Sequence, residues 1–214
     1  MVRVAAVWVR LGCVLAVACS WVSACGGSAS RIDGSKTPDQ IERLRRALPA
    51  LNLGPGDLAE AQGRSPIWTV LTLAQYAGAG EAGAEFSSLS AADQVIEVYQ
   101  ATYSPGSLND RRGVNSVVFL LPTSEQAAGF LKGLSEFYES AGIEMHPWGA
   151  LPDGVESGYV GDAGGTSRDL RLVLAVSRQV VLFYADSNAA RGSDETTPTE
   201  AAAKIIKRLA QAQD

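Results

Sequence analysis

The chain is poor in the residues that build catalytic and metal centres. Its 214 residues include one histidine, His146, and three cysteines, all at or before residue 25. From residue 26 onward no thiol can act as a nucleophile, bind zinc or form a disulfide. No G-x-S-x-G motif is present to place a serine nucleophile. We therefore expect no enzyme activity, no catalytic residues, no metal site and no cofactor.

The glycine-rich and acidic stretches also lack the spacing of known binding loops. Gly54-Pro55-Gly56 and the run from Gly161 to Gly165 match neither a phosphate-binding loop nor a dinucleotide fingerprint. We interpret both as turns. Asp153, Glu156 and Asp162 lie close in sequence but do not follow the EF-hand pattern. We interpret them as solvated loop residues.

The charge balance excludes another class of partner. The chain has 18 basic and 23 acidic residues, a formal net charge of −5. Without Arg3 and Arg10, which precede an apolar stretch, the balance is 16 against 23, a net charge of −7. An acidic surface repels phosphate backbones. We expect no nucleic-acid partner.

The N-terminus has the layout of an export signal. Arg3 and Arg10 precede Leu11–Val22, which is apolar or small apart from Ser20. A membrane-spanning helix needs about 20 consecutive apolar residues, and Arg10 leaves fewer than that. Small residues next to the cleavage point are typical of signal peptides. Two alternatives stay open: an uncleaved membrane helix, and ordinary secretion after cleavage at residue 18 or 24.

The run Val22-Ser23-Ala24-Cys25 resembles the lipobox of bacterial lipoproteins. The resemblance implies that residues 1–24 are a lipoprotein signal peptide and that Cys25 receives a diacylglyceryl group. Such fatty acyl chains, for example palmitate, would hold the protein on the extracytoplasmic face of the cell membrane. Residues 25–36 are then the lipidated cysteine and a Gly/Ser-rich flexible tether.

The remaining residues, 37–214, have the pattern of one α+β domain. Capping boxes at Thr37, Thr123 and Thr197 predict three helix starts, and Pro49 is expected to end the first helix. Alternating or continuous apolar runs predict strands near residues 95–101, 114–121, 159, 170–176 and 179–185, with a turn at 177–178 between the last two. The segment 68–76 fits strand or helix. We predict an antiparallel sheet with helices packed mainly on one face, including the helices that start at Thr123 and Thr197.

The part from Asp93 to Gln211 resembles a group of actinobacterial surface lipoproteins and the extracellular sensor domains of some actinobacterial receptor kinases. The resemblance rests on Val117-Val118-Phe119-Leu120, the capped helix from Thr123, the hairpin around Arg178 and the final Ala-rich helix. Those kinase domains carry disulfides, which this domain cannot form. The resemblance implies a ligand-sensing or scaffold module.

Aromatic residues mark a candidate ligand site. Trp148 and Tyr159 flank a Gly/Pro-rich loop, and His146 lies nearby. Aromatic side chains on loops often line sugar or apolar-ligand surfaces. We predict that a ligand site, if present, lies between this loop and the helix that starts at Thr123. The alternative is that Trp148 closes the end of the hydrophobic core.

Together these features predict a membrane-anchored, non-catalytic module of the cell envelope that binds a small amphiphile or a partner protein. One alternative is a structural or assembly lipoprotein without a small-molecule site. A second is a hydrolase whose residues no motif reveals. An apolar cavity above about 300 Å³ would favour ligand binding, and an exposed apolar patch would favour a protein partner.

Overall fold

The structure, a computed structural model, describes residues 38–54, 56–58, 67–72, 75–76, 89, 92–103, 113–163, 170–187 and 197–214. The predicted signal peptide, the lipidated Cys25, the tether and the Thr37 cap lie outside these ranges.

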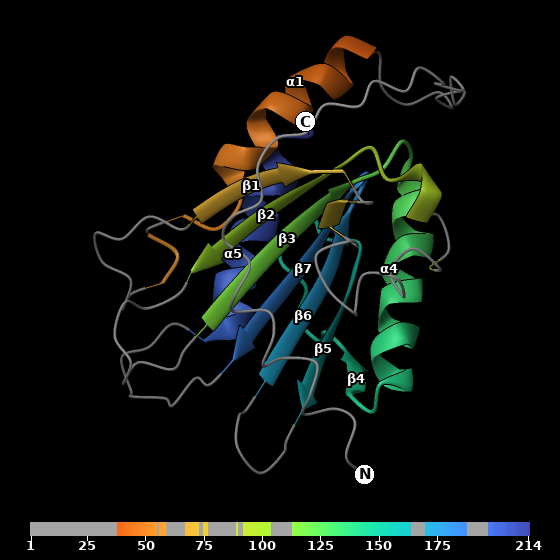
Figure 1. The fold of residues 1–214 in the computed structure, drawn as a ribbon, viewed down its shortest axis with the longest axis vertical. Helices are drawn as coiled ribbons and strands as arrows, with labels where there is room; N and C mark the ends of the chain where they lie inside the picture. The colour runs from red at the N-terminus through yellow and green to blue at the C-terminus, as the bar shows by residue number, and fades with distance from the viewer. Residues whose placement is uncertain are drawn as a thin grey trace.

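Seven strands form one antiparallel sheet in the order β1-β2-β3-β7-β6-β5-β4 (Figure 1). In chain order the strands are β1 (Ile67–Leu71), β2 (Glu97–Tyr103), β3 (Gly113–Leu120), β4 (Glu144–Pro147), β5 (Ser157–Ala163), β6 (Leu170–Ser177) and β7 (Val180–Ser187). The helices are α1 (Pro38–Leu51), α4 (Ser124–Ser140) and α5 (Pro198–Gln211), with a short 3-10 turn, η3 (Ala92–Gln94). The predicted α+β class, with a single antiparallel-sheet domain, is confirmed.

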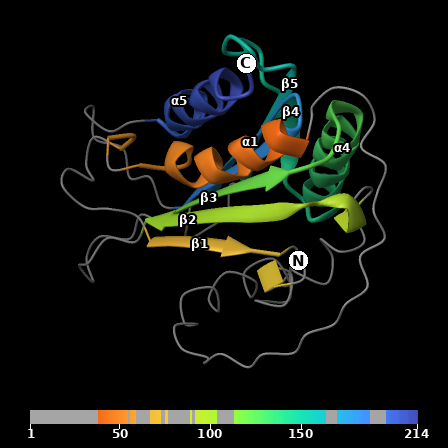
Figure 2. The same ribbon diagram turned by 90° about the horizontal axis from the view of Figure 1, so that it is seen from above.

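Helices cover both faces of the sheet. Helices α1 and α5 pack on one face, and α4 packs on the other (Figure 1). Figure 2 shows α1 beside α5, on the same side of the sheet. The prediction that α4 and α5 share a face is therefore wrong. The physical reason lies in the central strands: β7 is buried at all but its last residue, so both of its faces need an apolar cover.

Strand β3 shows this double burial residue by residue. Val118 and Leu120 point into the core on the α5 side, and Val117 and Phe119 point into the core on the α4 side. All four side chains are fully buried. The sheet is thus the middle layer of three, as expected for strands with apolar residues at successive positions.

Helix α4 forms as predicted from its cap and its apolar stripe. The Thr123 hydroxyl accepts a hydrogen bond from the Gln126 backbone N–H at 3.2 Å. Phe130 and Leu134 are fully buried against the sheet, while Phe137, one turn later, is half-buried. The spacing of Phe130, Leu134 and Phe137 in the sequence predicts that all three face the sheet. This is confirmed for the first two residues, and Phe137 is only half-buried.

The turn between β6 and β7 lies one residue later than predicted. Ser177 pairs with Val180, so the two turn residues are Arg178 and Gln179. Arg178 has a φ of 48°, which is uncommon for a side chain other than glycine. Its guanidinium donates to the Gln213 carbonyl at 2.7 Å and also bonds the Asp214 carboxylate. These contacts hold Arg178 in the turn.

Helix α1 continues to Leu51, two residues beyond Pro49, where the prediction ended it. Buried contacts fix the chain that follows. The Asn52 amide donates to the carbonyls of Tyr99 and Ser116, at 2.9 and 3.2 Å, and accepts from the Ser116 hydroxyl at 2.5 Å. These bonds join the end of α1 to β2 and β3.

A second set of contacts joins the same segment to α5. Arg208 donates to both carboxylate oxygens of the nearly buried Asp57, at 2.6 and 2.7 Å, and to the carbonyls of Leu51 and Asn52. Such a two-pronged pair fixes both position and angle. We call this group of contacts the Arg208 clamp.

Candidate functional site

The structure separates the three residues predicted to form a ligand site. His146 lies in strand β4 rather than in a loop, and its exposed ring approaches the Glu144 carboxylate at 3.5 Å. Trp148 packs on the α5 side of the sheet, whereas Tyr159 packs on the α4 side. Since the sheet lies between Trp148 and Tyr159, the two aromatic rings do not line one surface.

The segment from Trp148 to Glu156 lies beside α5 and not beside α4. A Cβ built on Gly154, whose φ is 80°, would come within 2.9 Å of the Ala210 Cβ. Leu151, in the same segment, is the exposed large hydrophobic side chain among the described residues, at 39%. The half-buried Trp148 covers core residues here, as the alternative interpretation proposed, and Leu151 leaves a small apolar spot at the surface.

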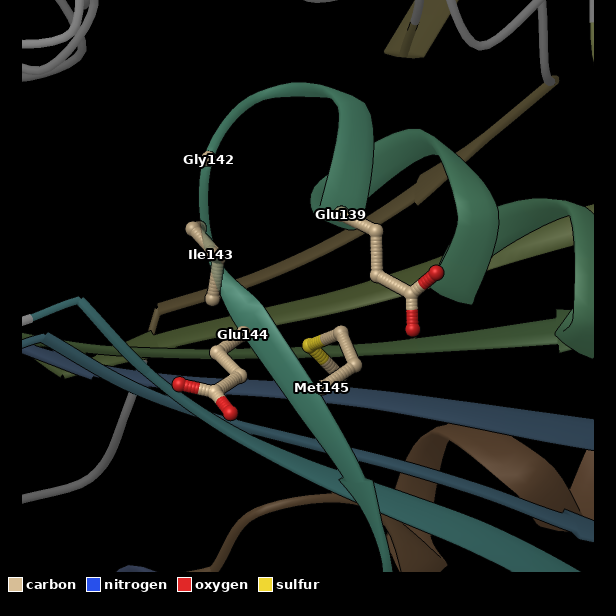
Figure 3. Close-up of a pocket in the computed structure, with 5 residues that line it drawn as sticks. All are labelled: Glu139, Gly142, Ile143, Glu144 and Met145. Carbon is tan, nitrogen blue, oxygen red and sulfur yellow. The ribbon is translucent and has the colours of Figure 1, made fainter.

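A shallow hollow of about 340 Å³ lies where α4 meets β4. Its lining residues are Glu139, Gly142, Ile143, Glu144 and Met145 (Figure 3). Figure 3 shows Glu139 and Met145 on one side of β4 and Glu144 on the other. The two carboxylates diverge, so they do not converge on one ligand atom. Among the described residues, no group of three or more His, Cys, Asp or Glu side chains could hold a metal ion.

Two glycines of β5, Gly158 and Gly161, leave room for side chains from other segments to pack against the strand. Gly161 is inside β5, and a Cβ there would lie 2.3 Å from the Met145 Sδ. A Cβ on Gly158 would meet the Leu174 carbonyl at 2.9 Å and the Trp148 ring at 3.0 Å. The interpretation of Gly161 as a turn residue is therefore wrong, because its role is close packing within the sheet.

The three acidic residues that the sequence assigned to a solvated loop, Asp153, Glu156 and Asp162, do not share one environment. Asp153 and Glu156 are exposed loop residues. Asp162 lies in β5, and its carboxylate accepts hydrogen bonds from Nε and Nη2 of Arg171, at 2.5 and 2.7 Å. This bond raises the pKa of Arg171 above its ordinary value. Asp162 thus belongs to a cross-strand ion pair and not to a carboxylate pair available for chemistry.

A different group of residues gathers on the α4 side of β1, β2 and β3. Helix α4 packs mainly on β4 to β7 and also reaches β3, where Phe130 contacts Phe119. The register aligns Thr69 with Gln100 and Thr102 with Asn115. Thr69 is exposed and the other three are half-buried. With the nearby Tyr76 we call these residues the uncharged surface.

Hydrogen bonds and ring contacts hold the uncharged surface together. The Gln100 Nε2 donates to the Asn115 Oδ1 at 3.0 Å. Asn115 also hydrogen-bonds the Tyr76 hydroxyl. The Tyr76 ring meets Phe119 edge-on, with centroids 5.8 Å apart and planes at 83°. Contacts within the fold therefore hold these side chains in one arrangement.

The tyrosines beside this surface stay protonated at neutral pH. Burial raises the pKa of Tyr76 above its usual range, and the hydrogen bond from Asn115 offsets only part of that change. Burial also raises the pKa of Tyr138, on α4, and Tyr76 adds to the effect. Both phenols are therefore buried, neutral hydroxyl groups.

Charge is absent from this face of the three strands. Glu97 is the single charged residue in β1, β2 and β3. Its carboxylate accepts a hydrogen bond from the Arg45 guanidinium of α1 and another from the Tyr99 hydroxyl, at 2.6 Å. Tyr99 belongs to the core on the α5 side, so this charged group faces away from Gln100 and Asn115.

Sequence reasoning missed this group, although a signal was present. Gln100 and Asn115 are amides on the face of β2 and β3 where Val98, Val117 and Phe119 are apolar. A polar residue among apolar ones on one strand face is expected at positions with a special role. Tyr76 fell in the segment that the sequence left ambiguous.

No helix in the described part of the chain is long and apolar enough to cross a membrane.

Comparison with known proteins gives a structural match. No protein-family description matches the chain, and no curated protein matches it in sequence. Among solved structures, the chain is similar to the extracellular domain of PknH from Mycobacterium tuberculosis, with a TM-score of 0.53 and 15% sequence identity. The match covers 78% of this chain and 96% of that domain. At this identity the likeness shows a shared fold.

Proposed function

We propose that the protein is a lipid-anchored, extracytoplasmic lipoprotein that serves as a non-catalytic binding module of the cell envelope. The proposal is supported by the pairing of residues 1–24, which resemble a lipoprotein signal peptide before Cys25, with a domain whose fold is similar to that of an extracellular domain. The N-terminal run supplies the anchor, and the folded part supplies the binding surface. The ligand or partner is a small molecule or another envelope protein.

The anchor is tested by mutating the lipidated residue. Cys25→Ser should block acylation and move the protein from the membrane fraction to the soluble fraction, since two or three acyl chains hold a protein firmly whereas none leaves it free. The matched control is Cys19→Ser, which should leave both fractionation and acyl mass unchanged. Cys25→Ser protein that stays in membranes, together with wild-type protein lacking acyl mass on Cys25, would refute the proposed anchor.

A specific observation supports the alternative of an assembly lipoprotein. Leu151 is exposed beside the half-buried Trp148, and in the assembly alternative this apolar spot is the edge of the contact with a partner protein. Leu151→Ser tests this alternative by co-purification from solubilised membranes. An envelope partner that is retained by the wild type and lost in the variant would favour assembly over ligand binding.

A further inference from the structure

The two helices on one face of the sheet carry an excess of positive charge. Helices α1 and α5 together contain six basic and three acidic residues, which gives a net charge of +3. Helix α4, on the other face, contains one basic and three acidic residues, a net charge of −2. The helical cover of the sheet is therefore basic on one face and acidic on the other, in a chain whose net charge is −5.

Four of the six cations on α1 and α5 point away from the sheet. The apolar stripes of both helices lie in the same core cluster, so the opposite stripes face outward. Figure 2 shows the two helices side by side. The exposed cations on their outer stripes are Arg43 and Arg46 on α1 and Lys204 and Lys207 on α5. We call these four residues the basic surface.

The acidic residues of α1 and α5 lie nearer the helix starts. Asp39 and Glu200 are in the first turns, where a carboxylate stabilises the beginning of a helix, and Glu42 follows in the next turn of α1. The C-terminal halves of the two helices meet at the Arg208 clamp, and Arg46 and Lys207 belong to these halves. The positive charge is therefore concentrated where the two helices join.

Acidic residues also limit the basic surface on one side. The segment 148–156 lies beside α5 and carries the exposed Asp153 and Glu156. The surface that can meet an anionic partner is therefore the outer side of α1 and α5 and does not extend over that segment.

The expected lipid anchor joins the chain next to this surface. Cys25 precedes Pro38, the first residue of α1, by 13 residues. A fully extended chain spans at most about 3.6 Å per residue, so α1 begins no more than about 47 Å from the acyl chains. Such a short connection holds the domain at an effective concentration in the millimolar range beside the bilayer. A contact that is weak in free solution is populated under this confinement.

We propose that the basic surface lies on anionic phospholipid headgroups of the membrane that anchors the protein, and that the acidic α4 face is turned outward. The inference rests on the proposed function, because the lipid anchor supplies the confinement. Lys and Arg side chains are attracted to an anionic bilayer within about one screening length. At longer range the net negative charge of the chain opposes the approach of any polyanion. The contact therefore needs the anchor, and a freely diffusing nucleic acid gains no such help.

The test measures the orientation of the anchored domain on vesicles. The full-length exported protein, acylated at Cys25, is reconstituted into phosphatidylcholine alone or phosphatidylcholine with about one third phosphatidylglycerol, which supplies the anionic headgroups. Because the chain has no thiol beyond residue 25, one added cysteine can carry a fluorescent donor. Ala50→Cys on α1 and Ala128→Cys on α4 are matched exposed positions on opposite faces. A dye on the lipid headgroups is the acceptor.

Energy transfer to the headgroup dye reports which face is closer to the bilayer. In anionic vesicles at about 0.1 M salt, transfer from residue 50 should exceed transfer from residue 128 by about twofold or more. Salt at about 1 M shortens the screening length from about 10 Å to about 3 Å and should remove at least half of this difference. Neutral vesicles should do the same. Equal transfer from both positions in anionic vesicles, or a difference that neither change reduces, overturns the proposal.

A combined variant ties the orientation to the named residues. Changing all four residues of the basic surface to Gln should reduce the difference as much as neutral vesicles do. Lys132→Gln removes an exposed cation from α4 and is the control, with an unchanged difference expected. All five side chains are at the surface, so matching melting curves show that lost orientation reports charge and not unfolding. A combined variant that keeps the wild-type difference overturns the proposal.

Failure of this inference stays distinct from failure of the anchor. Acylated protein whose two labels give equal transfer leaves the proposed lipoprotein in place and refutes the orientation. Protein without acyl mass on Cys25 refutes the anchor, and with it the confinement on which the orientation depends. A label at residue 50 that responds to an added envelope protein and not to lipid composition assigns the basic surface to a protein partner and overturns the proposal.

Discussion

At the scale of single residues, Glu97 is the charged group with the clearest energetic role. It lies between the Arg45 guanidinium and the Tyr99 hydroxyl. The hydrogen bond from Arg45 lowers the pKa of Glu97 most, and the Tyr99 hydroxyl lowers it further, while burial opposes both. Because the folded-state pKa is below the unfolded one, Glu97 stabilises the fold above the unfolded pKa, about 4.3, and this contribution is lost as the pH falls through the folded pKa.

Glu97→Gln should therefore destabilise the protein at pH 7, and the difference from wild type should shrink as the pH falls below about 4.3. Denaturant melts at pH 7, 5, 4 and 3 measure this difference in unfolding free energy. Glu42→Gln is the control, since Glu42 forms exposed pairs with Arg45 and Arg46 that are worth about 1 kcal/mol or less. A difference between wild type and Glu97→Gln that is the same at every pH would contradict the assigned ion pair.

Two glycines should respond to the same substitution in opposite directions. Gly161→Ala places a methyl group where the Met145 Sδ lies, so it should cost about 1–3 kcal/mol of unfolding free energy. Gly129 lies inside α4 with no atom within 4 Å of a built Cβ. Gly129→Ala should stabilise by up to about 1 kcal/mol, because alanine is the better helix former. Equilibrium unfolding of both variants checks the pair, and a stable Gly161→Ala protein would refute the close approach of Met145.

At the scale of elements, the contact between α4 and the sheet contributes strongly to the free energy of unfolding. Phe130 is fully buried and its ring packs edge-on against Phe119, with centroids 4.9 Å apart. Phe130→Ala should cost about 3–5 kcal/mol. Lys132 lies on the outer face with a 73% exposed side chain, so Lys132→Ala should change stability by less than about 0.5 kcal/mol. Chemical denaturation that finds the two variants equally stable would refute the assigned helix face.

Local signals in the sequence were sufficient to predict most elements. The capping residues Thr123 and Thr197 each bond the backbone N–H three residues later, as the pattern implied. Strands β2, β3, β6 and β7 lie within a few residues of their predicted ranges. The segment near Tyr159 proved to be β5, paired with a short β4 that begins two residues after Gly142. These elements follow from apolar spacing and capping, which act over a few residues.

Tertiary placement could not be predicted in the same way. Strands β6 and β7 are apolar on both faces, and such a pattern does not say which helix covers which side. The predicted site failed to assemble for a related reason. Trp148 follows β4 and packs on the α5 side, whereas Tyr159 lies in β5 and faces α4. Because a strand presents alternate residues to opposite faces, closeness in sequence does not place two residues on one side of the sheet. The uncharged surface joins residues from β1, β2 and β3, which only the strand register brings together.

At the scale of the whole molecule, stability should come from the three-layer core without covalent help. The chain's cysteines, Cys13, Cys19 and Cys25, all precede the described residues, so no disulfide links the helices to the sheet. Reducing agent should leave the melting temperature unchanged. Thermal unfolding with and without reductant measures this, with Cys25→Ser as control. A lower melting temperature on reduction that Cys25→Ser abolishes would reveal a bridge between two molecules.

The Arg208 clamp makes the order of assembly a property of the whole chain. Arg208 and Leu51 are 157 residues apart in sequence, and closing a loop of that length costs about 4–5 kcal/mol of chain entropy before the contact returns anything. Until α5 has been synthesised and docked, the carbonyls of Leu51 and Asn52 and the Asp57 carboxylate have no guanidinium to satisfy them. A chain without α5 therefore leaves these polar groups at the end of α1 without their Arg208 partner. The contact therefore forms only in molecules whose last helix has docked.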